Sequence, residues 1–598
     1  MGRTGGRPRR SAVVWLSLGF GLAVAGLAVV PLALEAKDVA SSLLRAQDHA
    51  VALKEQMAAG EAEAAAASLQ RLQASASHAH RTSSGGLWDT AAKVPWLGRN
   101  VEAVQVTSAS IDDIATRGLP PLVEAGSTLS VQSFKPRDGQ VDVQALAALA
   151  PAVTEASQVL AENADDIRAI DAESLLGPLV RPVLDLQRQV DDADRAADAA
   201  GRVMRLAPAA LGATGEQHLL LVFQTNAEIR STGGLAGVFV LLTTKDGRIT
   251  LSAQAASGEL NLAADGTRQA DARLTRDERS AFGTIMGHDV RSTNISPDFP
   301  RVARIWADRA ERALGEDVDG VVSLDAVAMS YVLRGVGSVK VEGGPTLTAD
   351  NAVQRLLHGV YVDFEEPSAQ DAYFESATGR TFEAVMNGRG DWTRIVSALS
   401  EAASERRLQV WFREKDSQRV IADTAVAGRV AQDDDTPHIG LYVTDAAQSK
   451  MQWFLRYDTR AKATTCRADR SQVVLVTTSF RNQFSGDPEK SPWYVTGRGT
   501  RTEKGNQLLT YRLLAPRGGR VVGFTIDGQE RPLASSDVTY EGRPVQYGTL
   551  TIPPGDEISV TWRVQTAPGA DGDARYFETP GIDTSSNDVR VPSTCRRS

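Results

Sequence analysis

A run of polar residues between two predicted strands carries the side chains best suited to bind a ligand. Asn226, Glu228 and Arg230 alternate along this run, and Gly233 and Gly234 follow them. An arginine can hold a phosphate or a carboxylate through paired hydrogen bonds, and a neighbouring carboxylate can bind a cation. The two glycines would let the backbone approach a ligand or another strand closely. The same pattern also fits a structural role, in which Glu228 and Arg230 pair with each other and brace a turn.

A second polar cluster extends from Asp289 to Pro300. Within it, Arg291 and Asn294 could face a phosphate or a carboxylate, whereas Asp298 precedes a predicted helix and could cap its first turn. The two clusters together give the candidate ligand-binding residues, which are Asn226, Glu228, Arg230, Gly233, Gly234, Arg291, Asn294 and Asp298.

Familiar catalytic signatures do not occur in the sequence. None of the seven histidines lies in a His-Glu-x-x-His motif, and there is no P-loop, Gly-x-Ser-x-Gly motif or dinucleotide-binding fingerprint. His78 and His80 have a spacing that can chelate a metal, but the polar end of a helix explains them better. We therefore expect no metal and no cofactor, and the sequence identifies no catalytic residue.

Composition and charge exclude several classes of protein. The chain has 598 residues, enough for three or four domains, and its formal net charge of −9 argues against a nucleic-acid-binding protein. Two cysteines exclude a disulfide-dense scaffold, a zinc site with four cysteine ligands and an iron–sulfur cluster held by this chain alone. In an exported protein Cys466 and Cys595 are expected to form one disulfide, and two free thiols are the alternative.

Residues 1–36 predict a short cytoplasmic tail and one membrane-spanning helix. Arg3, Arg7, Arg9 and Arg10 precede an uncharged run from Ser11 to Leu34, and about 20 apolar residues suffice to cross a bilayer. The arginines should stay in the cytoplasm, which places the bulk of the chain outside the cell membrane. A signal peptide cleaved after Ala23-Val24-Ala25 is the alternative, and it would also export the chain.

Three folded regions are predicted after this anchor. Residues 37–206 read as a helical stalk or bundle, because Val39, Leu43 and Ala46 begin a coiled-coil seam that Ala50, Leu53 and Met57 continue. This seam could pack within the chain or against a second copy. Residues 215–430 alternate strand and helix patterns, which predicts an α/β domain. Residues 440–598 contain short strands separated by glycine and proline turns, which predicts a β-sandwich. The fold class is therefore multidomain α+β.

Six segments of the chain form an ordered set of motifs, which are 223–234, 296–300, 318–321, 347–351, 405–408 and 494–497. They resemble the signature blocks of domain-of-unknown-function family 4012. The resemblance implies a bacterial, exported protein anchored by one N-terminal helix, and it implies no activity.

The order of elements is also similar to that of the LytR-CpsA-Psr family, whose members attach lipid-linked glycopolymers to the cell wall. The sequence departs from this family in three places. Ser231 and Thr232 follow Arg230 where that family has an arginine–aspartate pair, and Ser252–Ala255 stands where a Pro-Arg-Asp motif is expected. The acidic segment Asp363–Glu366 replaces a later arginine-rich one.

Two hypotheses about function follow. The first is a non-catalytic binding or structural module that acts on cell-envelope glycopolymers or protein partners. The second is a Mg²⁺-dependent phosphotransferase for polyprenyl-pyrophosphate-linked glycopolymers. In it Arg230 and Arg291, with Glu228 or Asp298, handle phosphate or metal, and Arg248 could contribute to balancing the phosphate charge. The second hypothesis requires these three arginines to converge in one groove, whereas arginines paired with separate acids would argue against it.

Overall fold

The computed structural model describes residues 30–59, 61–95, 97–128, 135–430, 436–533, 537–583 and 588–595. The protein is a mixed α+β chain with a helical N-terminal region and C-terminal sheets. It divides into two compact units, residues 1–135 with 142–214 and residues 136–141 with 215–598. The regions predicted as an α/β domain and a β-sandwich thus share the second unit.

The predicted membrane span lies almost entirely in residues 1–29, outside the residues that the structure describes. Only its last residues are seen, where Val30 to Leu34 open a long helix. None of the helices in the described part of the chain combines the length and the apolar composition that crossing a bilayer requires.

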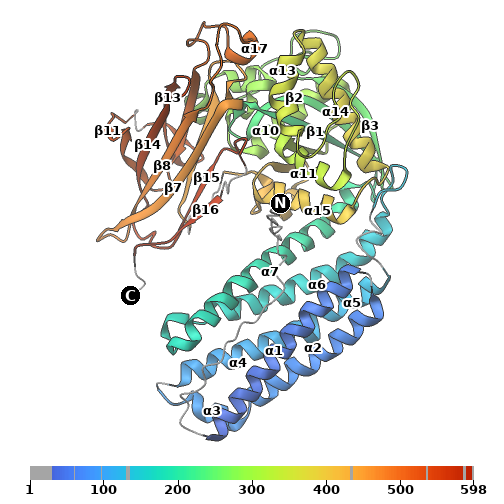
Figure 1. Ribbon diagram of the computed structural model, residues 1–598, viewed down its shortest axis with the longest axis vertical. Coiled ribbons are helices and arrows are strands. Elements are labelled where there is room, and N and C mark those ends of the chain that lie inside the picture. Colours follow the sequence, from blue (N-terminus) through green and yellow to red (C-terminus); the bar gives the residue numbers. More distant parts are fainter. Residues whose placement is uncertain are drawn as a thin grey trace, which may run out of the picture. The chain divides into compact units, whose positions relative to one another are not determined.

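The first unit is helical, and the predicted seam is buried inside it. Val39, Leu43, Ala46 and Leu53 of α1 are at most 1% exposed, because they pack against Leu69, Leu72 and Ala76 of α2 in one apolar core. The seam therefore packs within the chain, where α1 and α2 run side by side (Figure 1). The elements are α1 (Val30–Ala59), α2 (Ala62–Ser83), α3 (Gly86–Ala92), α4 (Gly98–Asp113), the π-helix η1 (Ile114–Gly118), α5 (Leu119–Thr128), α6 (Val143–Arg168) and α7 (Gly177–Ala210).

A five-stranded sheet organises the first half of the second unit, with the strand order β3-β2-β1-β4-β5. The pair β1–β4 is parallel and the other pairs are antiparallel. Leu220 and Val222 of β1 pack against α10, whereas Phe223 packs against α11, because successive side chains of a strand point to opposite faces. The strands are β1 (Gln217–Arg230), β2 (Gly233–Lys245), β3 (Arg248–Ala256), β4 (Gly320–Asp325) and β5 (Leu408–Phe412).

Helices cover both faces of this sheet. The α10 side is closed by a segment of short helices, and the α11 side by α14 and α15. The helices are η4 (Glu259–Asn261), α8 (Arg276–Phe282), α9 (Ile285–His288), η5 (Val290–Ile295), α10 (Phe299–Leu314), α11 (Ala326–Val336), α12 (Ala352–Gln354), the π-helix η6 (Arg355–Gly359), α13 (Val360–Asp363), α14 (Pro367–Met386), α15 (Trp392–Ser404), α16 (Lys415–Ile421) and η7 (Ala425–Ala427).

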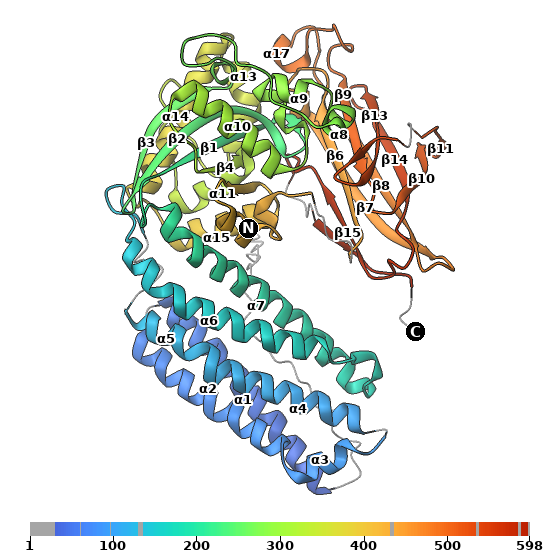
Figure 2. The same ribbon diagram turned by 180° about the vertical axis from the view of Figure 1, so that it is seen from behind.

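Two further sheets enclose one apolar core in the second half of the unit (Figure 2). Their strand orders are β11-β10-β14-β8-β7 and β12-β13-β9-β6-β15-β16. Side chains of β8 alternate between buried and half-buried, as expected for strands with one face on a core. Ile229, near the end of β1, joins this core, so the end of β1 lies where the α/β sheet meets the β-sheets.

The elements of this half are β6 (His438–Asp445), η8 (Met451–Phe454), β7 (Leu455–Cys466), β8 (Gln472–Asn482), α17 (Trp493–Thr496), β9 (Gln507–Leu514), β10 (Arg520–Ile526), β11 (Gln529–Glu530), β12 (Thr539–Tyr540), β13 (Arg543–Ile552), β14 (Glu557–Gln565), β15 (Ala574–Glu578) and β16 (Asp588–Val591).

Candidate functional site

Most of the polar run that the sequence predicted as a turn belongs to β1. The pairing of β1 with β2 is interrupted by a bulge. Thr225 pairs with Leu235 before the bulge, and Ile229 pairs with Gly234 after it, so Asn226 to Glu228 have no partner on β2. A β-carbon on Gly234 would lie 2.2 Å from the carbonyl of Thr225, so only glycine fits there. Gly233 has a φ of +133°, which also favours glycine. Gly234 thus allows two strands to approach closely, and Gly233 provides the positive φ at the start of β2.

Glu228 lies at the centre of a buried cluster of charges. Its Oε1 accepts a hydrogen bond of 2.7 Å from Arg230, as the structural alternative predicted, and its Oε2 accepts one of 2.5 Å from Lys450. All three residues are at most 7% exposed. Burial would raise the pKa of Glu228, but the charges of Lys450 and Arg230 lower it to about 2. The carboxylate is therefore ionised and held by two cations.

Aromatic rings and a second carboxyl surround this cluster. The Lys450 ammonium lies 5.3 Å from the ring centroid of Tyr361 and 6.0 Å from that of Tyr494, and the two rings are stacked. Asp445 accepts hydrogen bonds from the backbone amides of Ala447 and Gln448. Burial and the charge of Glu228 raise the pKa of Asp445 to about 6.

Asn226 belongs to a separate network at the start of α11. Its Nδ2 donates to Asp325 at 2.9 Å, and the same carboxylate oxygen pairs with Arg407 at 2.8 Å. The other oxygen of Asp325 accepts from the backbone amide of Ala328, which caps α11. Arg407 also pairs with Glu405 at 2.6 Å. The side chain of Asn226 thus helps to hold a buried salt bridge between β4 and the segment before β5.

Asn294 is fully buried and ties η5 to the sheet. Its Nδ2 lies 3.0 Å from Gln224 Oε1, 2.9 Å from Thr232 Oγ1 and 2.8 Å from the carbonyl oxygen of Gly234. These acceptors belong to the β1–β2 hairpin, so Asn294 fixes the position of η5 against it. Its contacts are those expected of a structural residue.

Asp289 and, to a smaller extent, Glu228 raise the pKa of Arg291, so Arg291 lies near the Glu228 cluster, whereas Arg248 does not join it. Arg291 is 49% exposed and pairs with Asp289. Burial would raise the pKa of Asp289, but its hydrogen bonds with Arg291 and the charge of Arg291 lower it to about 2. Arg248 lies at the β2–β3 turn, at the end of the sheet opposite Arg230, and its guanidinium contacts the Asp138 carbonyl and Gln140. The convergence of three arginines that the phosphotransferase hypothesis requires is not found.

Asp298 occupies the N-cap position of α10, but its side chain makes no capping hydrogen bond. Its Oδ1 instead accepts from the backbone amide of Val430 at 3.1 Å. Burial raises the pKa of Asp298 to about 6. The structure thus shows a hydrogen bond to the chain after β5 in place of the capping hydrogen bond that the sequence suggested.

The raised pKa of Asp298 leads to a testable pH dependence. An acid whose pKa is higher in the folded state stabilises the fold while it is protonated, and this stabilisation is lost as the pH rises from about 4 through 6. Asp298→Asn cannot ionise, so its free energy of unfolding relative to the wild type should rise by about 1–3 kcal/mol between pH 4 and 7.5. Urea denaturation at both pH values measures this difference, with the exposed Asp277→Asn as the matched control. A constant difference between wild type and Asp298→Asn across this range would contradict the prediction.

The sequence did not indicate Lys450, Asp325 or Arg407 as members of the site. Lys450 lies 222 positions after Glu228, and Arg407 lies 82 positions after Asp325. The sequence singled out the block 405–408 only as a family motif. Arg407 within this block was the one residue that could have pointed to the network. Among the described residues, no group of three His, Cys, Asp or Glu side chains could hold a metal ion.

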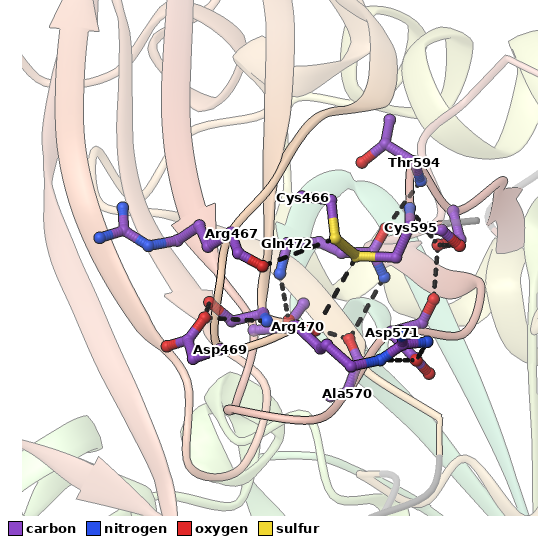
Figure 3. Close-up of a disulfide and its surroundings, with 12 residues drawn as sticks. Cys466, Arg467, Asp469, Arg470, Gln472, Ala570, Asp571, Thr594 and Cys595 are labelled. Atoms are coloured by element: carbon purple, nitrogen blue, oxygen red, sulfur yellow. Dashed lines mark hydrogen bonds and ion pairs between the residues drawn. A yellow bond between two sulfur atoms is a disulfide. The ribbon is translucent and has the colours of Figure 1, made fainter. Parts of the chain in front are cut away.

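The predicted disulfide is confirmed. Cys466 at the end of β7 is bonded to Cys595, with their Cα atoms 5.1 Å apart. Figure 3 shows Gln472 beside this bond, where it accepts from the amide of Thr594 and donates to the carbonyl of Ala570. The disulfide and these hydrogen bonds attach the chain after β16 to the start of β8.

The comparison with known proteins identifies one family. Residues 214–361 match the model of DUF4012, described as a protein of unknown function. No curated protein sequence matches the chain significantly.

Two solved structures are similar to parts of the chain at 12% identity. One is the transcriptional regulator yvhJ of Bacillus subtilis; the match covers 35% of this chain and 77% of yvhJ, with a TM-score of 0.19. The other is Lin1025 protein of Listeria innocua; the match covers 38% of this chain and 85% of Lin1025, with a TM-score of 0.21. TM-scores this low do not establish a shared fold. Over residues 214–361 the chain carries a match to the DUF4012 family, which confirms the predicted resemblance there; the blocks 405–408 and 494–497 lie outside the matched residues.

Proposed function

We propose that this chain is a single-pass, extracytoplasmic envelope protein that serves as a binding or structural module in the assembly of cell-wall or surface polymers. The exported location is supported by the four arginines before the apolar run Ser11–Leu34. The disulfide between Cys466 and Cys595 supports it as well, because such bonds persist in oxidising compartments.

One observation favours a non-catalytic module over an enzyme. The polar side chains of the candidate site are bonded to one another rather than presented to a substrate: Glu228 binds Arg230 and Lys450, and Arg291 binds Asp289. The buried pairs of Glu228 hold segments of the fold together, and a substrate would have to displace them. The phosphotransferase alternative has less support, since Arg248 lies at the far end of the sheet from Arg230.

The location is tested by fusing alkaline phosphatase, which is active only outside the cytoplasm, to the C-terminus of the full chain. We expect an active fusion, and an inactive one when residues 11–34 are deleted. A fusion that is inactive in both forms, although it is expressed, would overturn the exported location.

The absence of catalysis is tested on the purified full chain with Mg²⁺ and a polyprenyl-pyrophosphate-linked glycan. We expect no release of polyprenyl phosphate. Release that is lost in Arg230→Ala and retained in Arg248→Ala would establish the phosphotransferase instead.

A further inference from the structure

Three arginines converge on the α10 side of the α/β sheet, and none of them was among the candidates from sequence. Arg309 and Arg312 lie one turn apart on α10, and Arg268 lies on the segment before α8. The backbone amide of Ala264, from the same segment as Arg268, donates to the carbonyl of Arg312. Arg268 and Arg309 both donate to the carbonyl oxygen of His288. Gln269 donates to the carbonyl oxygen of Arg309 and accepts from the Arg312 guanidinium, so the three arginines lie close together. Burial and the charges of Arg312 and Arg268 also lower the pKa of Arg309.

Arg309 is fully buried and only partly bonded. Its Nη2 donates to the carbonyl oxygens of Gly287 and His288, at 2.6 Å and 3.3 Å. Its Nε and Nη1 are buried and have no hydrogen-bond partner in the described part of the chain. A buried guanidinium with two free nitrogens is costly unless another group binds them.

The two exposed arginines are bound only to neutral acceptors. Arg312 donates through Nε to Gln269 Oε1 at 2.7 Å. Arg268 donates through Nη2 to Nε2 of His288 at 2.8 Å and to its carbonyl oxygen. Because a guanidinium can only donate, Nε2 of His288 must accept, and its Nδ1 carries the proton given to Asp271.

Two carboxylates face this cluster without pairing with its arginines, and Asp271 keeps its charge because a neutral His288 only donates a hydrogen bond to it. Asp271 binds His288, and Asp289 binds Arg291 and Asn261. No described carboxylate lies within ion-pair distance of Arg268, Arg309 or Arg312. The cluster therefore holds three positive charges that the folded chain does not neutralise through direct contact.

We propose that Arg268, Arg309 and Arg312 form a binding site for a phosphate group. Arginine suits this ligand because its planar guanidinium donates pairs of hydrogen bonds to phosphate oxygens. Arg268 and Arg312 are exposed and can meet the ligand from solvent, and the buried Arg309 beside them has two nitrogens without a partner in the described part of the chain. This site is independent of the proposed function, since it shares no residue with the Glu228 cluster.

The test is calorimetric titration of the purified full chain, in a neutral detergent, with inorganic phosphate at constant ionic strength. We expect one phosphate bound per chain, at least tenfold weaker binding in the double variant Arg268→Ala with Arg312→Ala, and loss of binding in Arg309→Met. The matched control is Arg304→Ala, an exposed arginine on the same helix outside the cluster, which should bind as the wild type does. The double variant changes exposed residues only, so it keeps the test valid even if Arg309→Met does not fold.

The proposal is overturned if the wild type binds no phosphate beyond a matched chloride control, or if the double variant and Arg304→Ala bind equally well. Vesicles of phosphatidylglycerol then identify the source of the phosphate. Vesicle binding that is weakened only in the double variant indicates a lipid headgroup, and equal vesicle binding by all variants indicates a soluble or polymer-borne phosphate. Both vesicle results support the site.

Discussion

Glu228→Gln should lower the free energy of unfolding by about 4 kcal/mol, because it removes the shared partner of two buried cations. In the wild type the carboxylate binds Arg230 at 2.7 Å and Lys450 at 2.5 Å. A neutral amide cannot balance either charge, so Lys450 would lose its carboxylate partner and Arg230 would interact only with the more distant Asp445. Urea denaturation, followed by the fluorescence of the tryptophans in the second unit, measures the loss.

The matched control is Glu489→Gln, which breaks an ion pair with Lys504 at 2.6 Å. Glu489 is 74% exposed, and exposed pairs contribute about 0–1 kcal/mol. If Glu228→Gln destabilised the protein no more than Glu489→Gln, the cluster would not stabilise the fold.

The same variant has a pH signature of its own. Glu228 has its pKa lowered to about 2 in the folded state, so it stabilises the fold above its ordinary pKa, and this stabilisation is lost as the pH falls towards 2. The difference between wild type and Glu228→Gln should therefore shrink between about pH 5 and pH 2. A difference that stays constant over this range would contradict an ionised, doubly paired Glu228.

Local patterns in the sequence predicted those features of the fold that depend on neighbouring residues. The seam from Val39 to Leu53 predicted the buried face of α1, because a helix brings residues three and four apart onto one side. Alternating strand and helix patterns predicted the α/β sheet, and Glu228 and Arg230 predicted their own ion pair from their proximity in the chain. The single pair of cysteines in an exported chain predicted its disulfide.

What the sequence did not show depends on contacts between distant segments. Asn226 to Glu228 have the polarity of a turn, yet they form a bulge within β1, because pairing with β2 resumes at Ile229. Lys450 carries no local signal, since only the packing of the second half of the unit on the end of β1 brings it to Glu228. The Arg268, Arg309 and Arg312 cluster depends in the same way on how one segment folds back over α10.

Arg407→Met is the second change for which we expect a large effect, a loss of about 4 kcal/mol in the free energy of unfolding. The Arg407 side chain is fully buried, where it pairs with Asp325 and Glu405 and donates to the carbonyl oxygens of Gly581 and Asp583. Burial would lower the pKa of Arg407, but Asp325 and Glu405 raise it above its usual value. Methionine fills much of the space, yet it leaves the Asp325 carboxylate buried without a cation.

The control is Arg413→Met, which removes an arginine that is 40% exposed and pairs with Glu311. This change should cost about 0–1 kcal/mol. A loss in Arg407→Met no greater than in Arg413→Met would mean that the buried network contributes little to the fold.

A double-mutant cycle separates the lost charge balance from lost packing. Asp325→Asn keeps an oxygen that can accept from Ala328 and cap α11, but it removes the negative charge that Arg407 balances. Combined with Arg407→Met, it should therefore recover part of the lost stability, whereas Asp325→Asn alone should destabilise the protein. Strictly additive losses in the double variant would show that Arg407 acts through its packing and its backbone hydrogen bonds. A positive coupling would establish the pair with Asp325 as the contact that joins β4 to the segment before β5.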